Sequence, residues 1–265
     1  MATTKVRYNQ IKTGLPAGGD VNYNDVSLLL NMEGSNGSTT FTDSSSSQYS
    51  ITANGNASIS TSEFKFGSSS YYNNNDASSY LSVSNSVMNF GTEDFTIECW
   101  VRISTAITSD SNYLMSSYSS VGDRNNSSSI GIHKSGGLIY YTESGGTSQV
   151  YLEGGTSGWS ADTWYHIAAT RNGSTFRIFK DGVIQDSSSY SGSTFNGSQP
   201  NVIGNGHFFN TDGALNGYID QLRVTKGLAR YTSNFSVPTA AFPAFESKEG
   251  KGLLVGANGT IELES

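Results

Sequence analysis

The chain has 265 residues, a formal net charge of −7, 14% charged side chains, and 30 glycines against 4 prolines. Because helix surfaces are built largely from Glu, Lys and Arg, so small a charged fraction argues against a helical or α/β enzyme. The acidic balance excludes nucleic acid as a partner, since binding phosphates requires a basic surface. An aromatic share of 12% is too high for a disordered chain, so the composition favours a β-rich protein with a polar, largely neutral surface.

The first 25 residues are Gly-rich and aperiodic, and we predict an N-terminal arm over 1–25. The opening MATTKVRYNQIKTG lacks the apolar core of a signal peptide, so we expect synthesis in the cytoplasm without export. No apolar run of 18 residues occurs, so no membrane-spanning helix is expected. Cys99 is the only cysteine, which excludes an intramolecular disulfide.

Apolar residues then recur in short segments that are typical of β-strands. Phe95, Ile97, Cys99 and Val101 alternate along 95–102 and should share one buried face, with Cys99 as a small core residue. The other strands predicted in the first half of the chain are 26–32, 49–51, 57–60, 64–66 and 79–83.

The segment 164–185 carries the strongest local signal. Asn172-Gly173 and Asp181-Gly182 separate three apolar runs and supply the positive φ angles that type I′ turns demand. This spacing predicts an antiparallel meander of three strands.

A further strand is predicted at 217–224. Its apolar phase shifts between Ile219 and Leu222, which indicates a β-bulge near Asp220.

Roughly a dozen short strands with turn signals between them predict an all-β fold, an antiparallel sandwich or barrel. From Pro238 the tail PTAAFPAFESKEGKG reads as a linker to a hairpin, LLVGANGTIEL, with Asn258-Gly259 at its turn. A lone hairpin cannot bury its apolar face, so we expect it to dock on another surface. The predicted division is an arm over 1–25, a sandwich over 26–243, and a linker with the hairpin over 244–265.

Three stretches of sequence resemble a known family. FKFGSSSYYNNNDASSYLSVSNSVMNFGTEDFTIECWVR resembles the opening strands of a concanavalin A-like/laminin G-like domain. WYHIAATRNGSTFRIFKDGV and GYIDQLRVTKGLARYTSNFSVPTAAFP resemble its closing strands. The resemblance covers about residues 24–243 and implies a jelly-roll sandwich of two antiparallel sheets.

The ending G-x-I-D-x-L-R-V-T-K-G-x-A-R-Y-T is also similar to laminin G-like modules in virion proteins of tailed bacteriophages, especially marine phages and cyanophages. The tail GKGLLVGANGT is similar to short repeats of phage fibre and baseplate proteins. These similarities imply a virion location (head, tail or fibre) and other virion proteins as partners, reached through the arm and the hairpin. A trimer would follow by analogy with phage fibres, although a fold by itself does not fix a function.

Catalysis is not expected. His133, His166 and His207 are spread along the chain, and His166 lies inside a predicted strand, where packing is its expected role. No G-x-S-x-G nucleophile motif occurs. Glycosidases that share the sandwich fold need two carboxylates facing one cleft, whereas the matching strand here carries only Glu98.

The resemblance allows one Ca²⁺ at a sheet edge and requires no other cofactor. Calcium takes six to eight oxygen ligands. The candidate ligands lie in or beside predicted loops: Asp76, Asp123, Asp212 and Asp220. Other roles are open for two of them, because Asp220 could hydrogen-bond its own bulge and Asp212 opens an Asp-Gly turn.

A sugar site needs an aromatic platform for the C–H faces of the sugar and polar side chains for its hydroxyls. Two predicted loops have this composition, 118–126 (YSSVGDRNN) and 204–212 (GNGHFFNTD). The candidate ligand-binding residues are Tyr118, Asp123, Arg124, Asn205, His207 and Phe208. The alternative for the adjacent Phe208 and Phe209 is to cover a sheet edge or a neighbouring subunit.

Two hypotheses for the function follow. In the first, the sandwich is a non-enzymatic adhesin that binds carbohydrate on a host surface. In the second, it is a structural decoration or assembly protein with no glycan ligand. The low charge suits both, because a neutral surface can pack against other copies or meet neutral sugars.

Overall fold

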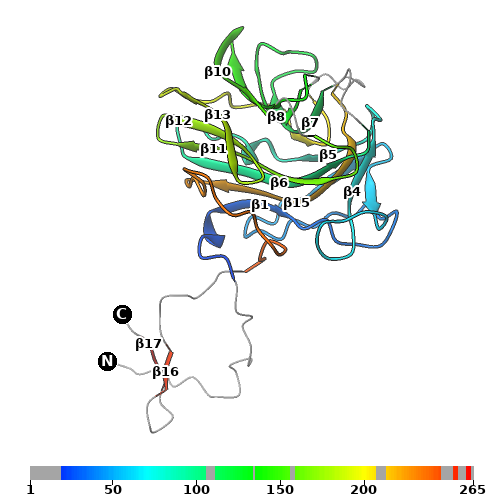
Figure 1. Cartoon of the computed structure of the whole chain (residues 1–265), viewed down its shortest axis with the longest axis vertical. Helices are drawn as coiled ribbons and strands as arrows, with labels where there is room; N and C mark the ends of the chain where they lie inside the picture. The colour runs from blue at the N-terminus through cyan, green and yellow to red at the C-terminus, as the bar shows by residue number, and fades with distance from the viewer. Residues whose placement is uncertain are drawn as a thin grey trace. The chain divides into compact units, whose positions relative to one another are not determined.

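The computed structural model describes residues 19–105, 111–133, 135–155, 159–206, 213–245, 253–255 and 261–263. In these residues the regular structure is antiparallel β-sheet plus two single-turn 3-10 helices, η2 (Tyr23–Asp25) and η3 (Asn85–Val87). By its contacts the chain divides into two units, Asn24–Phe242 and, separately, Met1–Tyr23 with Pro243–Ser265. The larger unit consists of two sheets packed face to face, so the predicted all-β antiparallel sandwich is confirmed (Figure 1).

The first sheet has eight strands in the order β13-β12-β11-β6-β15-β4-β3, with β1 also paired to β15. Strand β15 is long enough to pair with β4 along its first half and with β1 along its second half. The strands of this sheet are β1 (Val26–Leu30), β3 (Ser58–Ser60), β4 (Ser70–Asn74), β6 (Phe95–Ile103), β11 (Trp164–Asn172), β12 (Thr175–Lys180), β13 (Val183–Ser189) and β15 (Asn216–Lys226).

The second sheet has seven strands in the order β10-β9-β8-β7-β14-β5-β2. Figure 1 shows β8, β7 and β5 in a layer over β11, β6 and β15. The strands of this sheet are β2 (Thr52–Asn54), β5 (Tyr80–Val83), β7 (Asn112–Tyr118), β8 (Ser127–Ile132), β9 (Leu138–Ser144), β10 (Thr147–Gly154) and β14 (Asn201–Ile203).

The core lies between the sheets and follows the period-two pattern. The alternating residues Phe95, Ile97, Cys99 and Val101 all point into it, as predicted. The Phe95 ring lies 5.7 Å from the ring of Tyr140, which comes from the opposite sheet. Burial raises the pKa of the Cys99 thiol, so Cys99 is an uncharged packing residue.

The predicted meander is formed by β11, β12 and β13, and one of its two turns differs from the expectation. Asp181 and Gly182 both have positive φ (48° and 76°), as a type I′ turn requires. At the other turn Asn172 pairs with Thr175, so the turn residues are Gly173-Ser174, with Gly173 at φ 59°. Glycine in the first position is typical of type II′. Asp94 holds this register, since its Oδ1 accepts the N–H of Gly173.

The predicted bulge near Asp220 is also confirmed. The register of β15 against β6 shifts between Asp220 and Arg223, and Gln221 adopts a positive φ of 53°. The Gln221 amide donates to the carbonyl of Asn31 at 3.1 Å and accepts the N–H of Phe242 at 2.9 Å. The segment after Pro238, predicted to begin a linker, therefore packs on the sandwich as far as the buried Phe242.

Two other predicted strands are corrected. The segment 64–66 is a loop, because the N–H groups of Lys65 and Phe66 donate to the Asp220 carboxylate instead of to a neighbouring strand. The strand expected at 49–51 begins only at Thr52, after a single bridge between Thr42 and Ser50.

The second unit contains the hairpin predicted at the C-terminus. Strand β16 (Leu253–Val255) pairs antiparallel with β17 (Ile261–Leu263). The turn at Asn258-Gly259 and residues 1–18 of the arm lie outside the described residues. In the described part of the chain no helix has the length and apolar character needed to cross a bilayer.

Candidate functional site

The outer face of the seven-stranded sheet carries a group of tyrosines. In β9 the residue Tyr140 points into the core, so its neighbour Tyr141 points outward. In β10 the outward residue paired with Tyr141 is Tyr151, and β7 contributes Tyr113. We call the group formed by Tyr113, Tyr141, Tyr151, Arg124 and Glu153 the tyrosine face.

The three rings differ in how open they are. Tyr113 and Tyr141 pack edge to face with 6.3 Å between ring centroids, and both are more than nine-tenths buried. Tyr151 lies near the sheet edge and is 45% exposed. Its hydroxyl donates to Glu153 Oε2 at 2.8 Å. The tyrosine face therefore presents one open ring beside two rings held rigidly by packing.

The hydroxyls of the tyrosine face are neutral and lie within the field of one cation. Burial raises the pKa of Tyr113 and of Tyr141, and burial followed by the bond to Glu153 raises that of Tyr151 to about 12. The positive charge of Arg124 acts on all three hydroxyls in the opposite direction. At neutral pH each tyrosine hydroxyl can both donate and accept a hydrogen bond.

Glu153 is held in its charged form at one side of the tyrosine face. Its Oε1 accepts a hydrogen bond from the Ser135 hydroxyl and lies 3.2 Å from His133 Nδ1. The Ser135 bond, acting against partial burial and together with Tyr151 and His133, lowers the pKa of Glu153. The tyrosine face thus combines a fixed carboxylate with the exposed guanidinium of Arg124.

The predicted loop 118–126 connects β7 and β8 beside the tyrosine face. Tyr118 is the last residue of β7, opposite Ser127, and is 6% exposed. Asp123 shapes the loop, since its Oδ2 accepts bonds from Ser119 Oγ at 2.9 Å and Asn126 Nδ2 at 3.0 Å. Among these candidate residues, Arg124 is the one most open to a ligand.

Residues 204–206, the described part of the predicted loop 204–212, reach the same face. Of its candidate residues, His207 and Phe208 lie outside the described residues. A Cβ added at Gly206 would come within 2.6 Å of the Tyr113 ring, so Gly206 packs tightly against Tyr113. Asn205 is fully buried, and its amide donates to the Ala77 carbonyl and accepts from the N–H of Gly206, which makes it a support of the loop.

In the described part of the chain the calcium candidates are engaged in internal hydrogen bonds, and no group of three or more His, Cys, Asp or Glu side chains that could hold a metal ion gathers there. Asp76 accepts bonds from Ser78 and Ser79, which lower its pKa. Asp220 binds the 65–66 loop, and its burial raises its pKa to about 6. Asp212 lies outside the described residues. These described surroundings do not fit a cation that requires six to eight oxygens.

Glu98, the acid weighed as a catalytic residue, lies on the outer face of the other sheet and is fully buried. Its Oε1 is 2.7 Å from Arg223 Nη2, and its Oε2 accepts the Tyr231 hydroxyl at 2.8 Å and lies 3.2 Å from His166 Nε2. Burial opposes ionisation, but Arg223 and His166 outweigh it and lower the pKa of Glu98 to about 2. Glu98 and the packed His166 are thus committed to internal bonds.

Sequence reasoning missed Tyr113, Tyr141, Tyr151 and Glu153. The sequence of β9, LIYYTES, does not alternate between apolar and polar residues, so it does not indicate which of Tyr140 and Tyr141 points outward. What joins these residues is strand register, because Tyr141 pairs with Tyr151 across one strand boundary. The register between two strands cannot be predicted from the sequence of either strand alone.

Comparison with known proteins agrees with this architecture. The family described as "Concanavalin A-like lectin/glucanases superfamily" (Laminin_G_3) matches residues 73–229, and the chain belongs to this family. No curated protein matches the chain.

Several solved structures share the fold. The binding domain of Paraclostridial Mosquitocidal Protein 1 superimposes with a TM-score of 0.59 at 18% identity, over 78% of this chain and 50% of that one. Domain 4 of AbnA, an extracellular GH43 arabinanase from Geobacillus stearothermophilus solved with arabinotriose, gives 0.54 at 15%, over 76% and 92%. The binding domain of Botulinum Neurotoxin DC in complex with SialylT gives 0.53 at 15%, over 77% and 48%. The chain thus spans about half of each toxin domain.

Proposed function

We propose that the sandwich is a non-enzymatic carbohydrate-binding domain and that its ligand lies on the tyrosine face. The observation that carries the proposal is the exposed Tyr151 ring, whose hydroxyl donates to the charged Glu153 and lies within the field of Arg124. A sugar has apolar C–H faces and many hydroxyls. An open aromatic ring complements the first, and fixed donors and acceptors complement the second.

The non-enzymatic part of the proposal rests on Glu98. Hydrolysis of a glycosidic bond requires two carboxyl groups on either side of that bond. Glu98 is sealed from solvent by its own partners, so it has no access to a substrate. The solved arabinanase domain with arabinotriose and the toxin domain with SialylT support a sugar ligand by analogy of fold.

The proposal also covers the location of the chain in a larger particle. We propose that the chain is a phage virion protein that contacts the host surface, with the second unit and its β16–β17 hairpin as the attachment to other virion proteins. The support is the similarity of the ending 217–243 and of the tail to phage proteins. Mass spectrometry of purified particles tests the location, and absence of the chain from intact particles would overturn it.

The binding claim is tested with the full chain on a glycan array, followed by titration of the best glycan. Tyr151→Ala and Arg124→Ala should each weaken binding about tenfold, because each removes one ring or charge in direct contact, worth about 1.4 kcal/mol. Val121→Ala is the matched control, since Val121 is 65% exposed in the same loop as Arg124. Equal binding by all three variants would overturn the site, and no binding to any glycan would favour the decoration hypothesis.

A further inference from the structure

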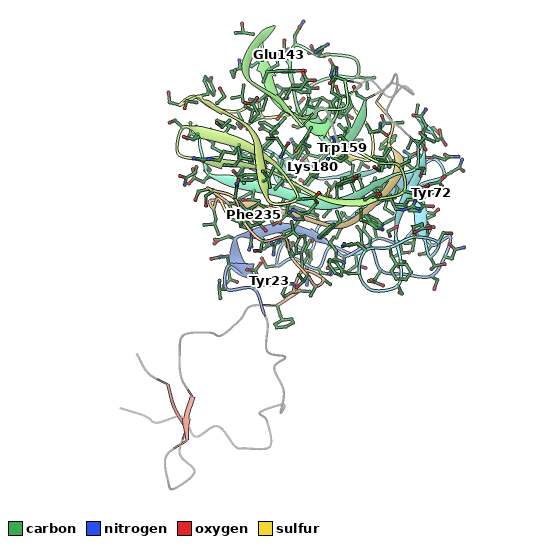
Figure 2. The ribbon with its side chains drawn as sticks, viewed as in Figure 1. Tyr23, Tyr72, Glu143, Trp159, Lys180 and Phe235 are labelled. Atoms are coloured by element: carbon green, nitrogen blue, oxygen red, sulfur yellow. The ribbon has the colours of Figure 1, made fainter. Side chains whose placement is uncertain are left out.

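A second row of aromatic side chains lies on the opposite side of the sandwich. It sits on the outer face of the eight-stranded sheet, part of which is covered by the segment 227–242. Figure 2 shows Phe235 of that covering segment and Tyr72 of β4 well separated along the sheet. At the β4 side the outer face is open, and Tyr72, Tyr218 and Trp164 are all partly exposed.

The register of four strands places these side chains in one line. Tyr218 of β15 pairs with Tyr72 of β4 on one side and with Arg102 of β6 on the other. Arg102 pairs in turn with Trp164 of β11. Since neighbouring strands are about 4.8 Å apart, the line runs for roughly 14 Å across the sheet.

The rings close over the arginine to form a continuous surface. Tyr72 and Tyr218 stack with 4.6 Å between centroids and 30° between planes. Trp164 is two strands away from Tyr218, yet their ring centroids are 6.4 Å apart, so the two rings lean toward each other. Arg102 lies beneath, with its guanidinium carbon 5.5 Å from the Tyr218 centroid and its side chain only 12% exposed. We call Tyr72, Tyr218 and Trp164 the aromatic strip.

Two carboxylates flank the aromatic strip and are fixed by the same arginine. Arg102 Nη1 lies 3.0 Å from Asp162 Oδ1, and Arg102 Nη2 lies 3.4 Å from Glu63 Oε1. The carboxylates remain 62% and 43% exposed, so their other oxygens can still accept hydrogen bonds. Asp162 is held in the left-handed region (φ 63°) by its N–H bond to the Ile103 carbonyl.

We infer that the aromatic strip is a second carbohydrate-binding site, for a neutral polysaccharide that runs along Tyr72, Tyr218 and Trp164. Stacked rings offer a flat apolar surface to the C–H faces of successive sugars, and fixed carboxylates accept their hydroxyls. Two carboxylates against one arginine leave the strip acidic, which disfavours phosphates and uronic acids. The same acidity disfavours a second copy of this chain, whose net charge is −7.

The consequence is a sandwich that binds polysaccharide on both sides. The aromatic strip and the tyrosine face lie on the outer faces of different sheets, so two chains of glycan could be held at once. Binding through two linked sites raises the overall affinity for a polymer well above that for a short oligosaccharide. This inference does not depend on the tyrosine face, and each site can be removed separately.

The test is a titration of the full chain with soluble neutral polysaccharides (arabinan, xylan and mixed-linkage glucan), with polygalacturonate as the anionic comparison. Trp164→Ala and Tyr72→Ala should each weaken binding of a neutral polymer at least tenfold, both alone and in a Tyr151→Ala background. Phe64→Ala is the matched control, because Phe64 is 43% exposed next to Glu63 but lies outside the strip. Trp164→Phe keeps a ring if the alanine variant fails to fold, and should abolish the tryptophan fluorescence change on binding.

Several outcomes would overturn the inference. They are binding by Trp164→Ala and Tyr72→Ala equal to that of Phe64→Ala, a tryptophan fluorescence change on binding that persists in Trp164→Phe, stronger binding of polygalacturonate than of every neutral polymer, or a dimer of the wild type that Tyr72→Ala dissociates. Loss of all binding in Tyr151→Ala alone would leave the tyrosine face standing and refute the second site. The inference is supported if Tyr151→Ala still binds the polymer and the double variant Tyr151→Ala/Trp164→Ala does not. That result would show that the tyrosine face is not the sole site of binding.

Discussion

Each outer face of the sandwich carries a cluster of Glu, Arg and Tyr side chains, but one cluster is buried and the other is partly exposed. On the eight-stranded sheet, Glu98, Arg223 and Tyr231 meet under the chain's own covering segment, and Glu98 is completely buried. On the seven-stranded sheet Arg124 is exposed, and Glu153, although bonded to Ser135, His133 and Tyr151, keeps 26% of its side chain exposed. Residue type therefore does not separate a structural cluster from a candidate binding site. What separates them is whether the charged groups are sealed from solvent, as Glu98 is, or partly exposed, as Glu153 is.

The largest expected effect on the free energy of unfolding comes from a substitution in the buried Glu98 cluster of the eight-stranded sheet. Arg223→Ala removes the guanidinium that neutralises Glu98 and leaves a buried carboxylate without its charge partner. Loss of one partner of a buried ion pair costs about 3–5 kcal/mol. Urea denaturation should show a free energy of unfolding lower by that amount, and a change below about 1 kcal/mol would contradict the buried role of the pair.

The second prediction concerns pH and Asp220, which lies under the 65–66 loop of the covered side. Burial raises its pKa from 3.8 to about 6, although backbone N–H groups partly oppose the shift. Between these values the folded state binds more protons than the unfolded state. The free energy of unfolding should therefore fall as pH rises from about 4 to about 6, by on the order of 2 kcal/mol.

Asp220→Asn provides the comparison for that measurement. An asparagine oxygen can still accept the N–H groups of Lys65 and Phe66, but it does not titrate. Urea midpoints measured from pH 4 to pH 7 should decline in the wild type relative to this variant. Parallel curves for the two proteins would contradict the raised pKa.

A smaller effect is expected at the edge of the covering segment. Gln221→Ala removes the amide that binds both Asn31 and the N–H of Phe242. The free energy of unfolding should fall by about 1–2 kcal/mol, because buried backbone groups lose their partner. Faster hydrogen exchange at Phe242 measures the release of the segment. Gln185→Ala is the control, since the Gln185 amide donates to the nearby Val183 carbonyl, and equal exchange in both variants would count against a holding role for Gln221.

The smallest effect on stability is expected on the open side. Glu153→Gln keeps the shape of the side chain and changes the free energy of unfolding by less than about 0.5 kcal/mol. It removes the charge beside Tyr151, so glycan affinity should still fall measurably. A loss of stability as large as that of Arg223→Ala would erase the distinction between the two faces.

The sequence predicted what local patterns determine. The alternation along 95–102 identified the inward face of β6, and the phase shift near Asp220 identified the bulge. The strands β7 and β8 were missed because their serines, as in NYLMSSY and SSSIGI, weaken the apolar signal. The turn residues alone predicted the wrong turn for the β11–β12 hairpin, because Asp94, far from it in the sequence, accepts the N–H of Gly173 and holds the register.

The candidate site could be predicted only in part, for a related reason. Composition identified the loop that carries Arg124, but the tyrosines beside it come from three strands whose proximity depends on pairing. Asn205 shows the opposite case, because a polar residue in a glycine-rich loop turned out to be fully buried. Burial depends on the whole fold, so a candidate residue's exposure cannot be read from its neighbours in sequence.

The most direct measurement is a crystal structure of the full chain with the oligosaccharide that binds best on the array. The account predicts a sugar ring in contact with Tyr151, with hydroxyls within hydrogen-bond distance of Arg124 and Glu153. An oligosaccharide bound only at the aromatic strip, or at neither face, would contradict the claim that the tyrosine face recognises carbohydrate.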